Sequence, residues 1–175
     1  PVLDTGGGED MILGEKSLLD ALGELSKTDL HDAVSRGIKT VQAEAKSLCP
    51  VHDGELRDSI YTTVENSEGG ILGTCYTNKS YAAYVEFGTG PKGQANHEGI
   101  SPDVAVSYSQ SPWWIHESQV GREMAERYGW PYIDTPDGRF YRCSGQAAQA
   151  YMYPALKNNE QEIERIFEEA VKKKK

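Results

Sequence analysis

The chain has 175 residues, of which 38% are hydrophobic, and a formal net charge of −9. Such an acidic chain does not bind nucleic acid by simple charge neutralisation, because that requires a surplus of Lys and Arg. No apolar run reaches the roughly 18 residues of a membrane-spanning helix, and the start lacks the apolar core of a secretion signal. We therefore expect a product made in the cytoplasm, without a membrane partner.

The chain has three cysteines, Cys49, Cys75 and Cys143. An odd number at wide spacing does not indicate a disulfide framework, so we expect buried thiols. Cys49 and His52 have a spacing found in zinc sites, but no second pair of ligands exists at such a spacing, and we expect no metal site.

Residues 1–27 include three consecutive glycines and little periodicity, which favours a flexible or partner-ordered arm with a short helix over 17–25. The remainder, 28–175, is expected to form one domain. Its first helix begins at residue 28 or 29 and ends before Pro50. Its apolar stripe has spacings of three and four: Leu30, Ala33, Val34, Ile38, Val41, Ala45 and Leu48.

The next elements are predicted from shorter sequence patterns. Alternation over 60–65 and an apolar run over 71–76, around the turn residues 66–70, predict a hairpin. A short helix is expected from Ser80, as its N-cap, to Gly88, as its C-terminal glycine. Residues 90–111 are expected to form a long loop.

The C-terminal half predicts a strand over 113–116, a short helix over 117–128, and a second hairpin around the turn 135–138. A last helix is expected from about Pro154 to Val171. The fold class is therefore α+β: a small antiparallel sheet of two hairpins packed against a long N-terminal helix and a C-terminal helix.

Candidate chemistry is sparse. The sequence "GTGPKG" lacks the spacing of a phosphate-binding loop, and we expect no cofactor and no catalytic residue. One alternative of another class stays open, because Asp53, Asp58 and Glu86 could converge on Mg²⁺ in a small hydrolase. Trp113, Trp114 and Trp130 are candidate interface residues, and a monomeric peptide-binding module would use the same side chains.

Three sequence blocks together resemble one family. "AKSLCPVHDGELRDSI" (45–60) resembles a helix end followed by Thr-Gly-x-Leu-Arg-x-Ser-Ile, and "YAAYVEFGTG" (81–90) resembles Tyr-x-x-x-x-Glu-x-Gly-Thr. "GQAAQAYMYPAL" (145–156) resembles Gln-Pro-Phe-x-x-Pro-Ala-Leu. In this order they resemble the phage head–tail joining and tail-completion family, typified by the tenth gene product of a lambda-like phage. Two departures are His52-Asp53 for Asp-Thr, and Ala150-Tyr151 for Pro-Phe.

The resemblance implies a structural virion protein at the neck of a tailed bacteriophage, without catalysis. It implies a ring of copies of this chain, six by tail symmetry or twelve by portal symmetry. The implied neighbours are a head connector or adaptor and the tail terminator or tail tube proteins. A tail-terminator ring is a sibling role. The family motifs fall on Pro50, Gly54, Leu56, Arg57, Ser59, Tyr81, Tyr84, Glu86, Gly88, Thr89, Gly145, Gln146, Pro154 and Ala155.

Two hypotheses follow from these residues. Tyr81, Tyr84 and Phe87 are expected to pack the short helix onto the sheet, while Glu86 either caps backbone N–H groups or pairs with Arg57, and we favour the pair. The acidic composition predicts a lumen with an excess of Asp and Glu, which repels DNA phosphates as the genome passes without specific binding.

Overall fold

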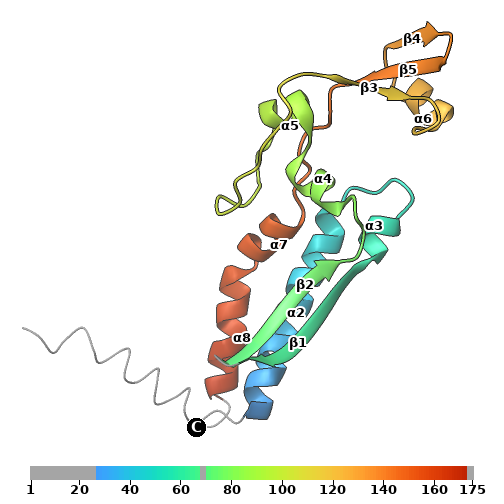
Figure 1. Ribbon diagram of the computed structural model, residues 1–175. Coiled ribbons are helices and arrows are strands. Elements are labelled where there is room, and N and C mark those ends of the chain that lie inside the picture. The colour runs from blue at the N-terminus through green and yellow to red at the C-terminus, as the bar shows by residue number, and fades with distance from the viewer. Residues whose placement is uncertain (1–26, 68–69, 173–175) are drawn as a thin grey trace, which may run out of the picture. The chain divides into compact units, whose positions relative to one another are not determined.

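The computed structural model describes residues 27–67 and 70–172. The expected arm and the short helix over 17–25 therefore lie outside the described residues, apart from residue 27. The elements, in chain order, are α2 (Lys27–Leu48), α3 (Glu55–Asp58), β1 (Ile60–Ser67), β2 (Gly70–Thr77), α4 (Ala82–Phe87), α5 (Gly90–Ala95), β3 (Trp113–His116), α6 (Arg122–Arg127), β4 (Tyr132–Thr135), β5 (Gly138–Cys143), α7 (Met152–Asn158) and α8 (Glu160–Lys172) (Figure 1).

The α+β class is confirmed, but the strands form two sheets. β1 and β2 make a sheet of two strands, and β3 joins the second hairpin in a sheet of three with the order β3-β5-β4. The expected last helix is interrupted at Asn159, and the expected loop over 90–111 begins with the short helix α5. Each added element is six or seven residues long, below the length at which periodicity identifies a helix.

The described residues group into two compact units. The first contains 27–42, 61–67 with 70–76, and 158–172, and the second contains 43–60 and 77–157. All three family-like blocks, 45–60, 81–90 and 145–156, lie entirely in the second unit.

The first unit is built on α2. Gly37 faces Ile163 of α8, and a Cβ built on Gly73 of β2 would lie 2.8 Å from Val34 Cγ1. The missing side chain of Gly73 therefore lets β2 approach α2 closely, and Figure 1 shows α2, β2 and α8 side by side. An exposed ion pair of 3.1 Å, Arg36 to Glu169, also joins α2 to α8.

The second unit has its own buried residues. Tyr141 in β5 and Tyr151 before α7 are the largest, each 1% exposed. β5 lies between its neighbours, so that Tyr141 is opposite Ile115 on one side and Tyr132 on the other. Within this central strand Tyr141 and Cys143 are buried, whereas Arg142 between them is exposed, so one face of β5 points inward at its end.

Candidate functional site

The first block forms a tight connection from α2 to the hairpin. Pro50 follows the end of α2, and Gly54 has a φ of 87°, a left-handed conformation that glycine adopts without a steric penalty. The Asp53 carboxylate accepts the amide hydrogen of Glu55 at 3.0 Å and so helps start α3. Leu56 is buried below this turn. The block therefore acts as a corner of the fold.

Ser59 closes this corner. Its buried hydroxyl donates to the Leu56 carbonyl at 2.7 Å, and it lies 2.6 Å from the Thr77 hydroxyl at the end of β2. A Ser at this position therefore ties the start of the hairpin to its end.

The second block supplies a buried carboxylate. Glu86, in α4, is 6% exposed. Its oxygens accept the amide hydrogens of Tyr151 at 2.8 Å, Met152 at 3.0 Å and Tyr153 at 3.1 Å. These amides begin α7, and the first amides of a helix have no partner within it. Glu86 thus caps a helix from 65 or more residues away.

This arrangement decides between the two hypotheses for Glu86. Capping is right and the pair with Arg57 is wrong, because Arg57 instead forms an exposed ion pair of 3.1 Å with Asp58. Ser80 is not the N-cap of α4 either, since Tyr81 has that position and the helix begins at Ala82.

The second and third blocks also bond along their backbones. Thr89 and Gln146 exchange backbone hydrogen bonds of 2.9 and 3.1 Å. A side chain on Gly145 would overlap the Thr89 carbonyl, and one on Gly88 would lie 2.7 Å from the Ala148 nitrogen. Because both glycines also have positive φ, the two segments can approach this closely only with glycine at these positions.

Further bonds complete what we call the block 2–3 clamp, defined by Glu86, Thr89, Gly145 and Gln146. The Gln146 side chain donates to the Tyr84 carbonyl at 2.6 Å, and the Gln149 amide donates to the Val85 carbonyl at 2.8 Å. Ala155 of the third block is fully buried, and Pro154 lies in the first turn of α7. The clamp therefore joins the second and third blocks and supports the start of α7.

The tyrosines of the second block do not pack inward as expected. Tyr84 is 60% exposed and Tyr81 is also exposed, whereas Phe87 is half-buried. Burial instead falls on Ala82 and Glu86, on the opposite side of α4. A six-residue helix offers too few apolar positions for the sequence to show which side faces inward.

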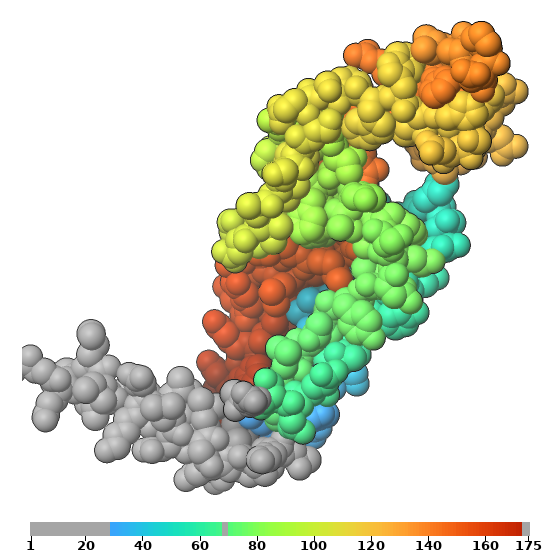
Figure 2. Space-filling view, viewed as in Figure 1, coloured from blue at the N-terminus to red at the C-terminus, as the bar shows by residue number. Residues whose placement is uncertain are grey.

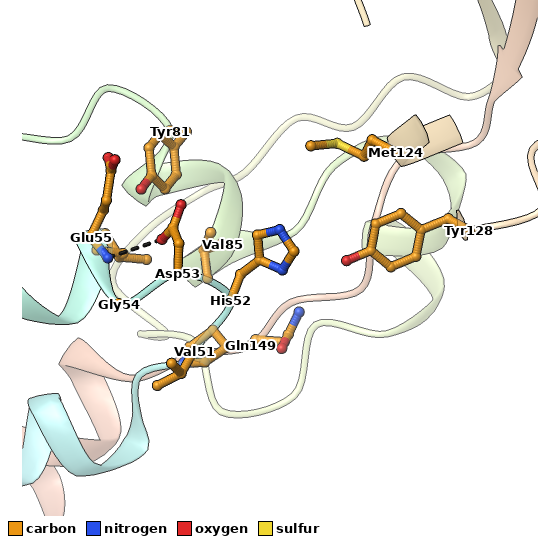
Figure 3. A pocket seen from close by; sticks show the side chains of 12 residues that line it. Val51, His52, Asp53, Gly54, Glu55, Tyr81, Val85, Met124, Tyr128 and Gln149 are labelled. Atoms are coloured by element: carbon orange, nitrogen blue, oxygen red, sulfur yellow. Dashed lines mark hydrogen bonds between the residues drawn. The ribbon is translucent and has the colours of Figure 1, made fainter. Parts of the chain in front are cut away.

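Two hollows flank this exposed side of α4. One, of about 450 Å³, lies between the first block and α6, and Figure 3 shows His52, Met124 and Tyr128 around it. The other, of about 530 Å³, lies beside Tyr84, Trp113 and Gln146. Tyr81 and Val85 line both hollows. We call this exposed face of α4, between the two hollows, the ridge of α4.

The tryptophans are divided between packing and exposure. Trp113 is half-buried against Gly90, and Trp130 is half-buried after α6. Trp114 is 47% exposed on the three-stranded sheet. Only Trp114 of the three is thus available as a large exposed contact, and its role as an interface residue stays a prediction.

The carboxylates of the hydrolase alternative do not converge. Glu86 is occupied by three amides, and Asp58 is paired with Arg57. Within 27–67 and 70–172, no three His, Cys, Asp or Glu side chains are grouped so that they could hold a metal ion. The cysteines are free thiols, two of them buried. Burial raises the pKa of the Cys49 thiol above its ordinary value, and this effect outweighs the nearby positive charge of Arg57, which lowers the pKa.

No helix in the described part of the chain is long and apolar enough to cross a membrane. No curated protein and no solved structure matches the chain.

Residues 16–88 match a family model described as HK97-gp10-like, "Bacteriophage HK97-gp10, putative tail-component". The match contains the first block and most of the second, while the third block lies outside it and reaches the second through the clamp. The match indicates a structural protein similar to a phage tail component, and this in turn makes the virion its expected location. Residues 16–88 are thus similar to an HK97-gp10-like phage tail component, in agreement with the phage resemblance that the sequence blocks predicted.

Proposed function

We propose that this chain is a structural protein of the phage neck, where copies of it form a ring that joins or completes the tail and lets DNA pass. The observation that carries the proposal is the family match over 16–88. The geometry is consistent with it, because the family-like residues of the second unit build a corner and a clamp.

The proposed ring needs two different surfaces on each copy, since a head-to-tail contact repeats around a closed circle. The ridge of α4, with exposed Tyr81 and Tyr84, fits one contact, because tyrosine is enriched at protein interfaces. We propose six copies, by analogy with tail symmetry, with a head connector or adaptor on one side and tail terminator or tail tube proteins on the other.

The net charge of −9 supports a lumen that DNA passes without adhering. Carboxylates along the pore repel phosphates, whereas lysines would retain them. A pore lined by lysines would contradict this part of the proposal.

Cryo-electron microscopy of particles that contain the chain tests the function. We expect density for a closed ring between head and tail, with the pore on the DNA path. Density at the end of the tail tube alone would instead assign the sibling role of tail terminator. Particles that assemble complete necks without the chain would refute both roles.

A further inference from the structure

We infer that the β1–β2 hairpin pairs edge to edge with the hairpin of a neighbouring copy, β2 of one copy against β1 of the next. The inference rests on the proposed function, because it assumes that copies of the chain form a ring. The main support comes from the backbone, because β1 and β2 are hydrogen-bonded to each other in a sheet of only two strands. In the described structure, no third strand adjoins the outer edges along 61–67 and 70–74.

Such edges are long and unprotected. Each strand has eight residues, longer than the usual five or six, and neither contains the Pro or Lys with which proteins commonly block an exposed edge. The strands are instead rich in residues that favour sheets, among them Ile71, Val64 and several threonines. This composition favours addition of another strand.

The distribution of charge points to a second copy as the partner. Glu65 is the single charged residue in the two strands, although 26% of the whole chain is charged. Two copies, each with a net charge of −9, repel each other most where carboxylates face one another. The hairpin is a surface at which they can meet without that repulsion.

The outward face of the hairpin also carries large apolar side chains. Leu72 is 56% exposed, and the exposed rings of Tyr61 and Tyr76 lie 6.0 Å apart. Figure 2 shows the hairpin, in teal and green, at the surface. The other face packs on α2 through Gly73. Pairing between copies would therefore extend both the backbone ladder and a band of tyrosine and leucine from one copy to the next.

The two edges of a hairpin differ, so pairing of β2 with the next β1 is heterologous and can close into a ring. Copies related by rotation place these neighbouring strands antiparallel, since β1 and β2 already run in opposite directions. Closure leaves no free edge, which removes the hazard of open-ended aggregation.

The test uses the full chain within particles and in solution. Copies with Thr63→Cys are mixed with copies with Thr74→Cys, both with Cys75→Ala, and treated with a short bismaleimide. We expect crosslinks between the two kinds of copy, because one carries its thiol on β1 and the other on β2. Crosslinks only between identical copies would show a symmetric contact and overturn the inference.

A second comparison uses Thr74→Lys, which brings a positive charge to the exposed edge strand. We expect it to weaken self-association by on the order of tenfold or more, because the seam would bury that charge. Ser107→Lys adds the same charge at another exposed position and is expected to leave association unchanged. Equal association of both variants would overturn the inference.

Amide hydrogen exchange separates the remaining outcomes. We expect the amides of 61–67 and 70–74 that point away from the partner strand of the hairpin to become protected only on assembly, while those bonded within the hairpin are protected in both states. Protection of the outward-pointing amides already in the monomer would mean that the chain covers its own edge, which refutes pairing between copies. A neck ring whose hairpin edges exchange freely would refute this inference while leaving the proposed function intact. Absence of the chain from the neck would refute the proposed function itself.

Discussion

The Glu86 carboxylate accepts the amide hydrogen of Tyr151 at 2.8 Å, across 65 residues of chain. The same carboxylate also accepts from Met152 and Tyr153, so a single side chain of α4 satisfies the opening amides of α7. Capping of this kind stabilises a helix both by hydrogen bonds and by placing negative charge at its positive end.

Replacing Glu86 by alanine is expected to lower the free energy of unfolding by roughly 3 kcal/mol, because buried amides lose a charged acceptor. Glu86→Gln keeps one acceptor oxygen and is expected to cost about half as much. Urea unfolding followed by circular dichroism measures both. Glu98→Ala, at an exposed position, is the control, and a loss for it as large as for Glu86→Ala would contradict the capping role.

Glycine at position 145 is expected to be indispensable. Gly145→Ala adds a methyl group that overlaps the Thr89 carbonyl, and we expect a loss of roughly 3 kcal/mol or more, or failure to fold. Two causes contribute to this loss, the steric overlap with Thr89 and the positive φ. Gly129→Ala isolates the effect of φ, because Gly129 also has positive φ but has open space around it. Its expected loss is about 1 kcal/mol. Similar melting temperatures for the two variants would show that the clamp can relax.

The ion pair between Asp134 and Arg139 predicts a dependence on pH. The hydrogen bond from Arg139 lowers the pKa of the Asp134 carboxyl below its ordinary value. The folded-state pKa is thus below the unfolded one, so the pair stabilises the fold above the unfolded pKa and ceases to do so as pH falls through the folded pKa.

An NMR titration of the Asp134 carboxyl should therefore show a midpoint below that of an unpaired Asp, about 3.9. Arg139→Lys removes the bidentate geometry and the stacking of the guanidinium on Tyr132, at 3.8 Å, and is expected to raise that midpoint. An unchanged midpoint would show that the pair contributes nothing in solution.

Tyr84 is expected to matter for assembly more than for folding. Its ring is mostly exposed, and Gln146 bonds to its backbone carbonyl, so Tyr84→Ala should change the free energy of unfolding by less than about 0.5 kcal/mol. If the ridge of α4 is an interface, the same variant should reduce the yield of complete particles. Val104→Ala, also exposed, serves as the control. Normal particle yield with Tyr84→Ala would remove the ridge from the proposed ring contacts.

Local patterns in the sequence predicted most of the secondary structure. The spacing of apolar residues predicted α2, and Pro50 predicted its end, because a helix face and a helix stop are both properties of neighbouring residues. Alternation and turn residues predicted the hairpins in the same way. The two glycines at positions 54 and 88 have the positive φ that the turns require.

Only the tertiary structure decided where these elements meet. The partner of Glu86 lies 65 residues away, and nothing nearby in the sequence distinguishes an amide acceptor from a partner of Arg57. The same holds for the outward direction of Tyr84 and for the separation of the hairpins into two sheets. Periodicity reports which residues share a face, whereas packing between distant segments decides what that face contacts.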